Sequence, residues 1–218
     1  MKKSQSGFTL IEIAIVMVII GLLLGGVLKG QSMINSAKVR SLNNGVDGIT
    51  AAWFAFQDRY RVYPGDMSLA NANAQIAAAP TITAGGNQDG TVLLGEGLAV
   101  WQHLAGAGFI SGTYTGVSPA VIYDCAVSVC PDNRFGLGFV IASAAVTFPV
   151  PAAHHLYTGS NIPVAIVAEL DRKIDDGLPT TGNIRGGATT GAAAACVAVG
   201  IYNIVGNSAD CGLASNAL

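Results

Sequence analysis

An uninterrupted apolar run near the N-terminus constrains this chain more than any other feature. From Phe8 to Leu28 almost every residue is apolar, and about 20 such residues suffice for one helix to cross a bilayer. The run contains a single charged residue, Glu12. A charged side chain in hydrocarbon costs roughly 2.5–3.5 kcal/mol on insertion scales, so intramembrane charges are usually functional. The run therefore predicts a membrane helix in which Glu12 has a defined task.

The residues around the run predict its orientation. Lys2 and Lys3 precede it, and positive charges favour the cytoplasmic side, so the remainder of the chain is expected to be exported. An ordinary secretory signal has a small-residue cleavage site of the A-x-A kind after its apolar region. The segment GLLLGGVLKGQS at the end of this run contains small residues but no such site. The run thus differs from an ordinary secretory signal.

The residues at the front of the run, KKSQSGFTLIEI, resemble the processing site of type IV pilins and type II secretion pseudopilins. In that family a membrane-embedded prepilin peptidase cuts after the Gly and N-methylates the new first residue. The resemblance implies a leader peptide at residues 1–7, cleavage between Gly7 and Phe8, and methylation of Phe8. Glu12 then becomes the fifth residue of the mature chain and matches the acidic position of the family.

This processing suggests a task for Glu12. Cleavage creates a positive amine on Phe8 near the membrane, and Glu12 of one subunit can pair with the amine of an adjacent subunit. In a low-dielectric medium such a pair matters much more than in water. The carboxylate would therefore favour subunits that join a filament over subunits that remain in the bilayer. The simpler alternative is a glutamate that snorkels at the cytoplasmic face of a plain anchor.

Beyond the membrane segment the apolar residues keep a helical spacing. They recur in alternating steps of four and three, which places them on one stripe of a helix. The stripe consists of Leu42, Val46, Ile49, Trp53, Phe56, Tyr60 and Tyr63. Pro64-Gly65 then stops the pattern, so one helix is predicted over residues 8–63, with 8–28 in the membrane and 29–63 in the periplasm. The stripe either joins helices of two subunits or packs on the chain's own head; its aromatic C-terminal half favours the head.

Residues 64–218 predict a globular head with short strands and glycine-rich turns. Apolar runs bounded by Gly, Pro or Asn are typical of strands, and four segments fit this description: 90–95, 134–148, 162–170 and 196–205. Residues 96–110 have helical spacing, with Gly108 near the end, and Asp176-Gly177 predicts a turn. The expected fold class is α+β, a long N-terminal helix packed on a head with an antiparallel sheet. The resemblance implies the same pilin-like architecture.

Four cysteines fall as two close pairs, Cys125 with Cys130 and Cys196 with Cys211. No CxxC and no zinc-like Cys/His spacing is present. An exported chain meets an oxidising compartment, so two disulfides are expected, with four buried free thiols as the alternative. Three connectivities exist. The two local ones are favoured because each closes a short loop that contains Gly, Pro or Asp.

The composition of the head argues against some partners. After Tyr63 there are four basic residues against ten acidic ones, a net charge of −6. Nucleic-acid binders usually carry a basic patch that releases counterions from phosphates, so no nucleic-acid partner is expected. Only 11% of the chain is charged, and it contains 28 Gly. Such a composition suits surfaces that contact neighbouring subunits closely.

The head contains residues that could serve catalysis or bind a metal ion. No G-x-S-x-G, H-E-x-x-H or P-loop pattern is present, and His103, His154 and His155 have no recognisable nucleophile setting, so no enzyme is expected. A calcium site is a hypothesis, because calcium favours several oxygen ligands from flexible loops. Its candidate ligands are Asp66, Asn87, Asp89 and Glu96. The alternative is that Asn and Asp before Gly are plain turn residues.

The combined expectation is a structural subunit of a type IV pilus or type II secretion pseudopilus that is processed and then polymerises through its N-terminal helix. Expected partners are copies of itself, prepilin peptidase, the inner-membrane assembly platform, other pilins and the membrane. The subunit would begin in the inner membrane of a Gram-negative bacterium, with a cytoplasmic N-terminus and a periplasmic head, and end in the filament at the cell surface. No cofactor is expected apart from calcium. The alternative is a single-pass anchored periplasmic binding protein that never polymerises.

Overall fold

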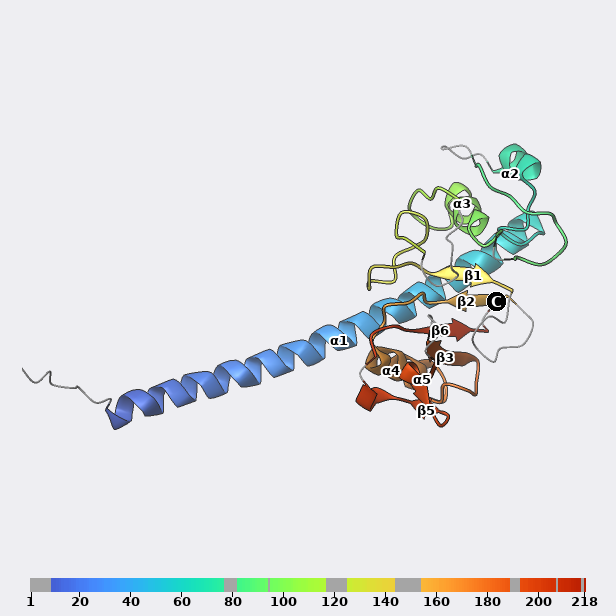
Figure 1. The fold of residues 1–218 in the computed structure, drawn as a ribbon. Helices are drawn as coiled ribbons and strands as arrows, with labels where there is room; N and C mark the ends of the chain where they lie inside the picture. Colours follow the sequence, from blue (N-terminus) through green and yellow to red (C-terminus); the bar gives the residue numbers. More distant parts are fainter. Residues whose placement is uncertain are drawn as a thin grey trace, which may run out of the picture. The chain divides into compact units, whose positions relative to one another are not determined.

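The computed structural model describes residues 9–76, 82–93, 95–116, 125–143, 154–188, 193–206, 208–216 and 218. The chain divides into two units, Met1–Lys38 and Val39–Leu218. The second unit, called the head unit below, combines helices with an antiparallel sheet (Figure 1). A long apolar N-terminal helix followed by such a head confirms the α+β class predicted from the sequence.

Helix α1 (Leu10–Tyr60) is the longest element of the chain. Its predicted start at Phe8 lies outside the described residues, and its predicted end at Tyr63 is wrong. Arg61 has φ +58, a left-handed conformation that commonly ends helices. Its N–H still donates to the carbonyl of Gln57 at 2.8 Å. The helix therefore ends ahead of the Pro-Gly pair that the prediction used as its stop.

The part of α1 that belongs to the head unit gives one face to the core of that unit. This face is the predicted stripe, and five of its residues are at most 6% exposed: Leu42, Val46, Ile49, Trp53 and Phe56. Tyr60 and Tyr63 lie partly buried against the same core. Burial of each large apolar side chain contributes about 1.5–3 kcal/mol to folding. The stripe thus packs on the chain's own head, as predicted.

Four short strands form the main sheet in the order β1-β2-β6-β3, and every neighbouring pair is antiparallel. The strands are β1 (Val140–Ala142), β2 (His155–Tyr157), β3 (Ile184–Ala188) and β6 (Cys211–Ser215). In register, Ile141 lies opposite Leu156, and Gly186 lies opposite Leu213. The side chains of β1, β2 and β6 are buried, so the sheet and the stripe of α1 contribute to one core.

Shorter elements complete the head unit. They are α2 (Leu69–Gln75), α3 (Ala99–Gly106), α4 (Val164–Ile174), α5 (Ala193–Cys196), β4 (Val197–Ala198), β5 (Ile201–Tyr202) and a 3-10 turn, η1 (Ile204–Gly206). Helix α3 lies inside the helix predicted at 96–110 and buries Trp101 and Leu104 completely. Gly108 follows its end with φ +80. The helix prediction is therefore confirmed, with shorter ends.

The predicted strand at 162–170 is wrong, because most of it belongs to α4. Among the buried residues of this helix, Val164, Val167 and Asp171 return after three and four residues, which is a helical period. Pro163 lies at the N-cap, where its missing N–H leaves no helical hydrogen bond unmade. A short apolar run alone does not distinguish a strand from a helix. Here the charged residues that follow the run continue the same helical period and belong to α4.

Two other strand predictions need correction. The segment 196–205 is a hairpin of β4 and β5 followed by η1, since Val199 and Gly200 both have positive φ (+51 and +76). Positive φ at both turn residues is what a two-residue hairpin with a type I′ turn requires, but a β-branched residue rarely adopts it. The described part of 90–95 is not a strand; the Val92 carbonyl accepts one hydrogen bond from Ser143 (2.9 Å) without a ladder.

The cysteines are joined in two local pairs. Cys125 bonds to Cys130, and Cys196 bonds to Cys211, each with Cα atoms 5.9 Å apart. This is the pairing that the spacing favours. All four residues are completely buried. The second bond ties the last residue of α5 to the first residue of β6, and so it closes the loop that contains the β4–β5 hairpin.

Two glycines of α1 offer a matched test of its packing. A Cβ at Gly45 would lie 2.7 Å from the ring of buried Phe139, whereas Gly48 has nothing within 4 Å. We expect Gly48→Ala to raise the free energy of unfolding by about 0.5–1 kcal/mol, because Ala favours helix. Gly45→Ala should lower it by about 1–3 kcal/mol through overpacking. Urea unfolding of the fragment 29–218 measures both, and equal effects would contradict the packing.

Candidate functional site

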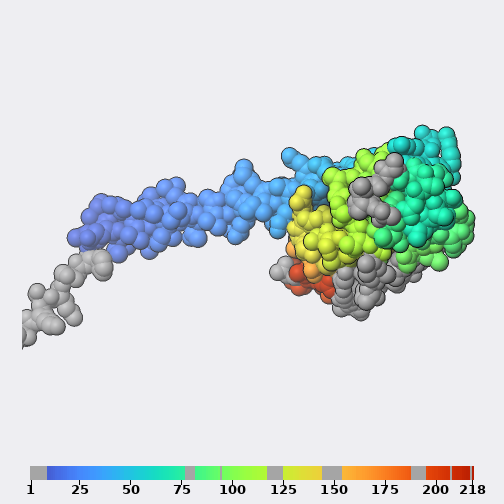
Figure 2. All heavy atoms as spheres, turned by 90° about the horizontal axis from the view of Figure 1, so that it is seen from above, coloured from blue at the N-terminus to red at the C-terminus, as the bar shows by residue number. Residues whose placement is uncertain are grey.

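The N-terminal part of α1 carries large apolar side chains around its circumference. In the unit Met1–Lys38 these side chains are exposed from Leu10 to Leu28, and Met33 and Ile34 follow. Figure 2 shows the dark blue part of the helix with its atoms at the surface on the face in view. Among the described residues, α1 is the one helix long and apolar enough to cross a membrane. A helix that is apolar all round suits lipid or other apolar helices better than water.

Glu12 lies in the first turn of α1, and Thr9 holds its carboxylate. The N–H and the Oγ1 of Thr9 both donate to Glu12 Oε2, at 2.8 and 2.7 Å, and the Glu12 N–H donates to Thr9 Oγ1 at 3.4 Å. This is the reciprocal arrangement of a capping box, which satisfies backbone N–H groups that hydrocarbon would leave unpaired.

The capping role of Glu12 was missed in the sequence, although Thr9-x-x-Glu12 is the spacing of a capping box. The backbone N–H and the hydroxyl of Thr9 both donate to Oε2, so Oε1 keeps its lone pairs for a further donor. The predicted cleavage site, Gly7 and Phe8, lies outside the described residues. The site therefore consists of one carboxylate that is oriented by its own helix on an otherwise apolar surface.

The four predicted calcium ligands lie in one hydrogen-bonded network of the head unit. They are Asp66, Asn87, Asp89 and Glu96. Asp66 is only 1% exposed, and its two carboxylate oxygens accept hydrogen bonds from the N–H groups of Asp89 (3.1 Å) and Gly90 (3.0 Å). Because a buried carboxylate needs donors, Asp66 fixes the course of the loop around residues 87–90.

The other carboxylates of this network are occupied in the same way. Asp89 Oδ1 accepts the N–H and the hydroxyl of Thr91, and Asp89 Oδ2 accepts the amide of Asn87 at 2.9 Å. These bonds lower the pKa of the Asp89 carboxyl. Glu96 accepts the N–H groups of Asn87 and Leu93, each at 3.1 Å. The geometry supports the turn-residue alternative, and calcium at this loop stays a prediction.

Two of the three histidines hold the loops of the head unit. His103 is completely buried; its Nδ1 accepts the N–H of Gly65 at 2.9 Å, and its Nε2 lies 3.1 Å from the carbonyl of Ala84, to which it donates. His154 Nε2 accepts the N–H of Val92 at 3.0 Å. Burial lowers the pKa of both imidazoles. Both rings therefore act as neutral links between loops that are distant in sequence.

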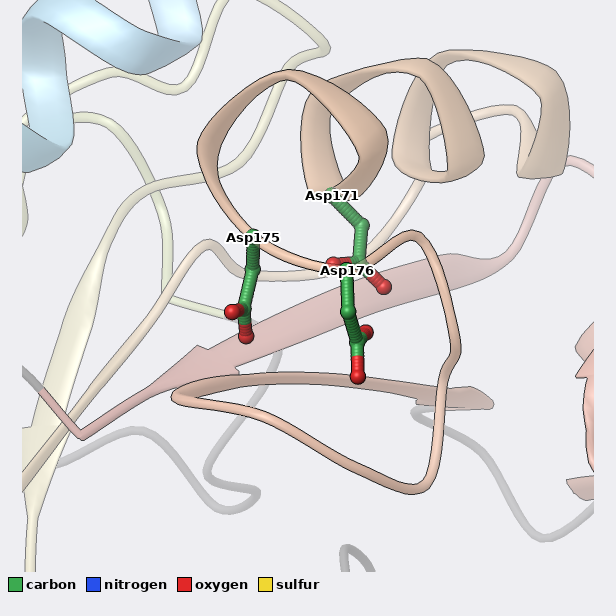
Figure 3. Close-up of side chains that lie close together, drawn as sticks. All are labelled: Asp171, Asp175 and Asp176. Carbon is green, nitrogen blue, oxygen red and sulfur yellow. The ribbon is translucent and has the colours of Figure 1, made fainter.

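One further cluster was not recognised in the sequence. Asp171, Asp175 and Asp176 bring one carboxylate oxygen each within 4.8 Å of the others at the end of α4 (Figure 3). Asp176-Gly177 was predicted only as a turn, and Gly177 has φ +77. The available signal was the i, i+4 spacing of Asp171 and Asp175, which places two acids on one side of a helix. Asp176 joins them because the helix ends before Asp175.

Residues 2–28 match the family model of the prokaryotic N-terminal methylation motif. This motif is the hallmark of type IV pilins and pseudopilins, so the match confirms the resemblance seen in the sequence. It indicates a type IV pilin-like or pseudopilin protein, and that class is structural and generally non-enzymatic. No curated protein and no solved structure matches the chain.

The match also bears on processing and location. The motif implies processing by a prepilin peptidase and assembly into filaments with other pilins. The apolar helix that carries it fits a membrane-anchored, surface-exposed pilin.

The burial of His103 generates a prediction for the pH dependence of stability. Its pKa is lowered to about 4 in the folded protein, against about 6.5 in an unfolded chain. The unfolded chain therefore takes up the proton first, and stability present above pH 6.5 is lost as the pH falls toward 4. This single group accounts for about 3 kcal/mol.

The matched variant is His103→Gln, which keeps a donor for the Ala84 carbonyl but does not titrate. Chemical unfolding of the fragment 29–218 at pH 7 and pH 4 measures the loss. We expect the wild type to lose up to about 3 kcal/mol more than the variant over this interval. An identical loss in both proteins would show that His103 does not carry the effect.

Proposed function

We propose that this chain is a structural subunit of a type IV pilus or type II secretion pseudopilus, made as a membrane prepilin and polymerised after cleavage. The observation that supports this most is the methylation motif at residues 2–28 on a helix with exposed apolar side chains and one carboxylate. The subunit acts by assembly and catalyses no reaction. Its head is periplasmic before assembly, and its N-terminus is cytoplasmic.

Removal of the leader changes the charge balance at the front of α1. Cleavage after Gly7 removes Lys2 and Lys3 and leaves a methylated amine on Phe8, next to Thr9. Within one subunit, Thr9 orients the Glu12 carboxylate and supplies part of its solvation. The negative charge that remains on Glu12 favours a cationic partner. The N-terminal amine of a neighbouring subunit is such a cation, and it lies at a similar depth in the membrane. The pair forms only between subunits, so it favours the filament.

The rest of the subunit supports polymerisation without taking part in this pair. The stripe of α1 is used inside the head unit, so the apolar residues before Val39 are the ones left for contacts with neighbouring helices. Prepilin peptidase, the inner-membrane assembly platform and other pilins are the partners that this route requires. An acidic head, with a net charge of −6 after Tyr63, is not suited to hold duplex DNA by charge alone.

The processing step is tested by Gly7→Arg. A bulky cation beside the scissile bond should block the peptidase, so full-length protein should accumulate in the membrane and no filaments should form. Immunoblotting of membrane and sheared-filament fractions measures this, in cells that express the peptidase. Ser4→Arg, which adds the same charge within the leader, is the control and should be processed. Normal filaments from Gly7→Arg would refute the assigned cleavage site.

The charge of Glu12 and its capping role are separated by a pair of variants. Glu12→Gln keeps an acceptor for Thr9, because Gln also serves in a capping box, but it removes the charge. We expect it to be processed normally and to reduce filament yield at least about tenfold, on the order of the cost of one unpaired intramembrane charge. Thr9→Val removes the hydroxyl and keeps the charge, and it should retain most of the yield.

Quantitative immunoblotting of sheared filaments against cleaved protein in the membrane measures both variants. A severe loss in Thr9→Val with normal yield in Glu12→Gln would assign the effect to helix capping and contradict charge pairing. Unchanged filament yield and normal processing in both variants would show that assembly does not depend on the charge of Glu12.

A further inference from the structure

A pocket of about 490 Å³ lies in the head unit, lined by residues of α1, the end of α4, the start of β3 and the end of β6. Its apolar lining consists of Val46, Ala51, Ile174 and Ile184. Ligand pockets in proteins usually measure about 300–1,000 Å³ and combine an apolar lining with a few polar groups. This pocket therefore has the size and the apolar surface that a small organic group requires.

Two carboxylates give the pocket a negative charge. Asp47 on α1 lines it, and its Oδ2 accepts a hydrogen bond from the amide of Asn43 at 3.0 Å. Asp175 at the end of α4 also lines it, and its Oδ2 accepts the N–H of Ile184 at 2.8 Å. Neither carboxylate belongs to an ion pair in the part of the chain that the structure describes. Because a carboxylate offers about four acceptor positions, both favour a cation with N–H donors.

Two uncharged groups of the lining are buried and have no hydrogen-bond partner among the described residues. They are Thr50 Oγ1, on α1, and Asn216 Oδ1, just after β6. A threonine hydroxyl inside a helix commonly bonds to the carbonyl four residues earlier, and Thr50 makes no such bond. A buried polar atom without a partner destabilises a fold and requires an explanation. Two such atoms from opposite elements of one pocket point to a ligand that supplies donors.

The chemistry of the lining favours a guanidinium over an ammonium group. A guanidinium has five N–H donors in one plane, whereas an ammonium has three, and it is more weakly hydrated, so it enters a partly apolar pocket at lower cost. An alkyl stem attached to it can pack on the apolar lining. Arg172 and Lys173 precede Ile174 on α4, but both are exposed and neither lines the pocket. The cation must therefore come from elsewhere.

We propose that this pocket binds a guanidinium group carried on an apolar stem. Asp47 and Asp175 supply the negative charge, and Thr50 and Asn216 accept N–H groups. A free guanidino compound and an arginine side chain of a second copy of the chain share this chemistry. In the second case the contact joins the heads of neighbouring subunits, and that case alone rests on the proposed function.

The test is a calorimetric titration of the full-length chain in detergent with butylguanidinium. Its matched control is butylurea, which has nearly the same shape and no charge. We expect saturable binding of butylguanidinium with a dissociation constant of about 1 mM or tighter. Butylurea should bind at least about tenfold more weakly, because hydrogen bonds between charged partners are the stronger ones. Equal binding of the two compounds, or no saturation at about 10 mM butylguanidinium, would overturn the proposal.

Three variants locate the site. Asp47→Asn keeps an acceptor for Asn43 and removes the charge, so it should weaken binding at least about tenfold. Asp58→Asn removes the same charge from an exposed position of α1 that does not line the pocket, and it should bind like the wild type. Thr50→Val keeps the shape and removes the hydroxyl. It should weaken binding and raise the melting temperature of the ligand-free protein, because a buried unpaired group is removed.

Two results with these variants contradict the site. One is a Thr50→Val protein that binds like the wild type and melts at a lower temperature, because the hydroxyl then serves the fold. The other is a loss of binding in Asp58→Asn as large as the loss in Asp47→Asn, because the attraction is then one of overall charge.

The yield of sheared filaments separates the two sources of the guanidinium group. If an arginine of a neighbouring subunit fills the pocket, Asp47→Asn should lower the yield about twofold or more, with normal cleavage and with Asp58→Asn unaffected. If free compounds alone fill it, both variants keep the wild-type yield. A wild-type chain that forms no filaments contradicts the proposed function, and the butylguanidinium titration still decides whether the pocket binds a guanidinium group.

Discussion

Helix α1 has to satisfy two different surroundings along its length. From Leu10 to Leu28 it is apolar on all sides and needs lipid or other apolar helices around it. From Val39 to Phe56 it is apolar on one stripe only, and that stripe belongs to the core of the head unit. The sequence changes from one pattern to the other within a single helix. The first pattern is suited to a membrane, and the second pattern supplies part of the core of the head unit.

Glu12 is the exception within the first pattern, and its surroundings explain how it is tolerated. Thr9 supplies two donors to one carboxylate oxygen, which lowers the cost of placing the charge in an apolar segment without neutralising it. A neutral side chain at this position would anchor the helix equally well. We therefore propose that the remaining charge serves a partner outside the chain.

Local patterns in the sequence predicted the parts of the structure that depend on neighbouring residues. The methylation motif, the stripe of α1 and helix α3 all follow from residues within a few turns of one another. The strands β3 and β6 were not predicted, because Ile184–Ala188 and Cys211–Ser215 are short and rich in Gly, Ala or Ser. They become strands by pairing with each other across the sheet. Helix α4 was predicted as a strand because the prediction used its apolar first part and not the charged residues that follow in the same helix.

The candidate cation ligands show the same limit. Acidic residues in a glycine-rich loop suggested calcium near Asp89, but folding supplies that loop with backbone donors. Folding also brings Tyr202 to Asp171 from a distant hairpin, and the Tyr202 hydroxyl donates to that carboxylate. Whether a carboxylate is satisfied depends on the N–H and O–H groups that tertiary structure places around it. Sequence spacing alone does not contain that information.

The mass of the intact protein purified from sheared filaments tests the central claim most directly. Processing at the assigned site predicts a chain that begins at Phe8, lacks residues 1–7 and carries one additional methyl group on its N-terminal amine. Fragmentation of the first residues locates that methyl group. Full-length protein with an unmodified Met1, recovered only from membranes and never from filaments, would contradict the account.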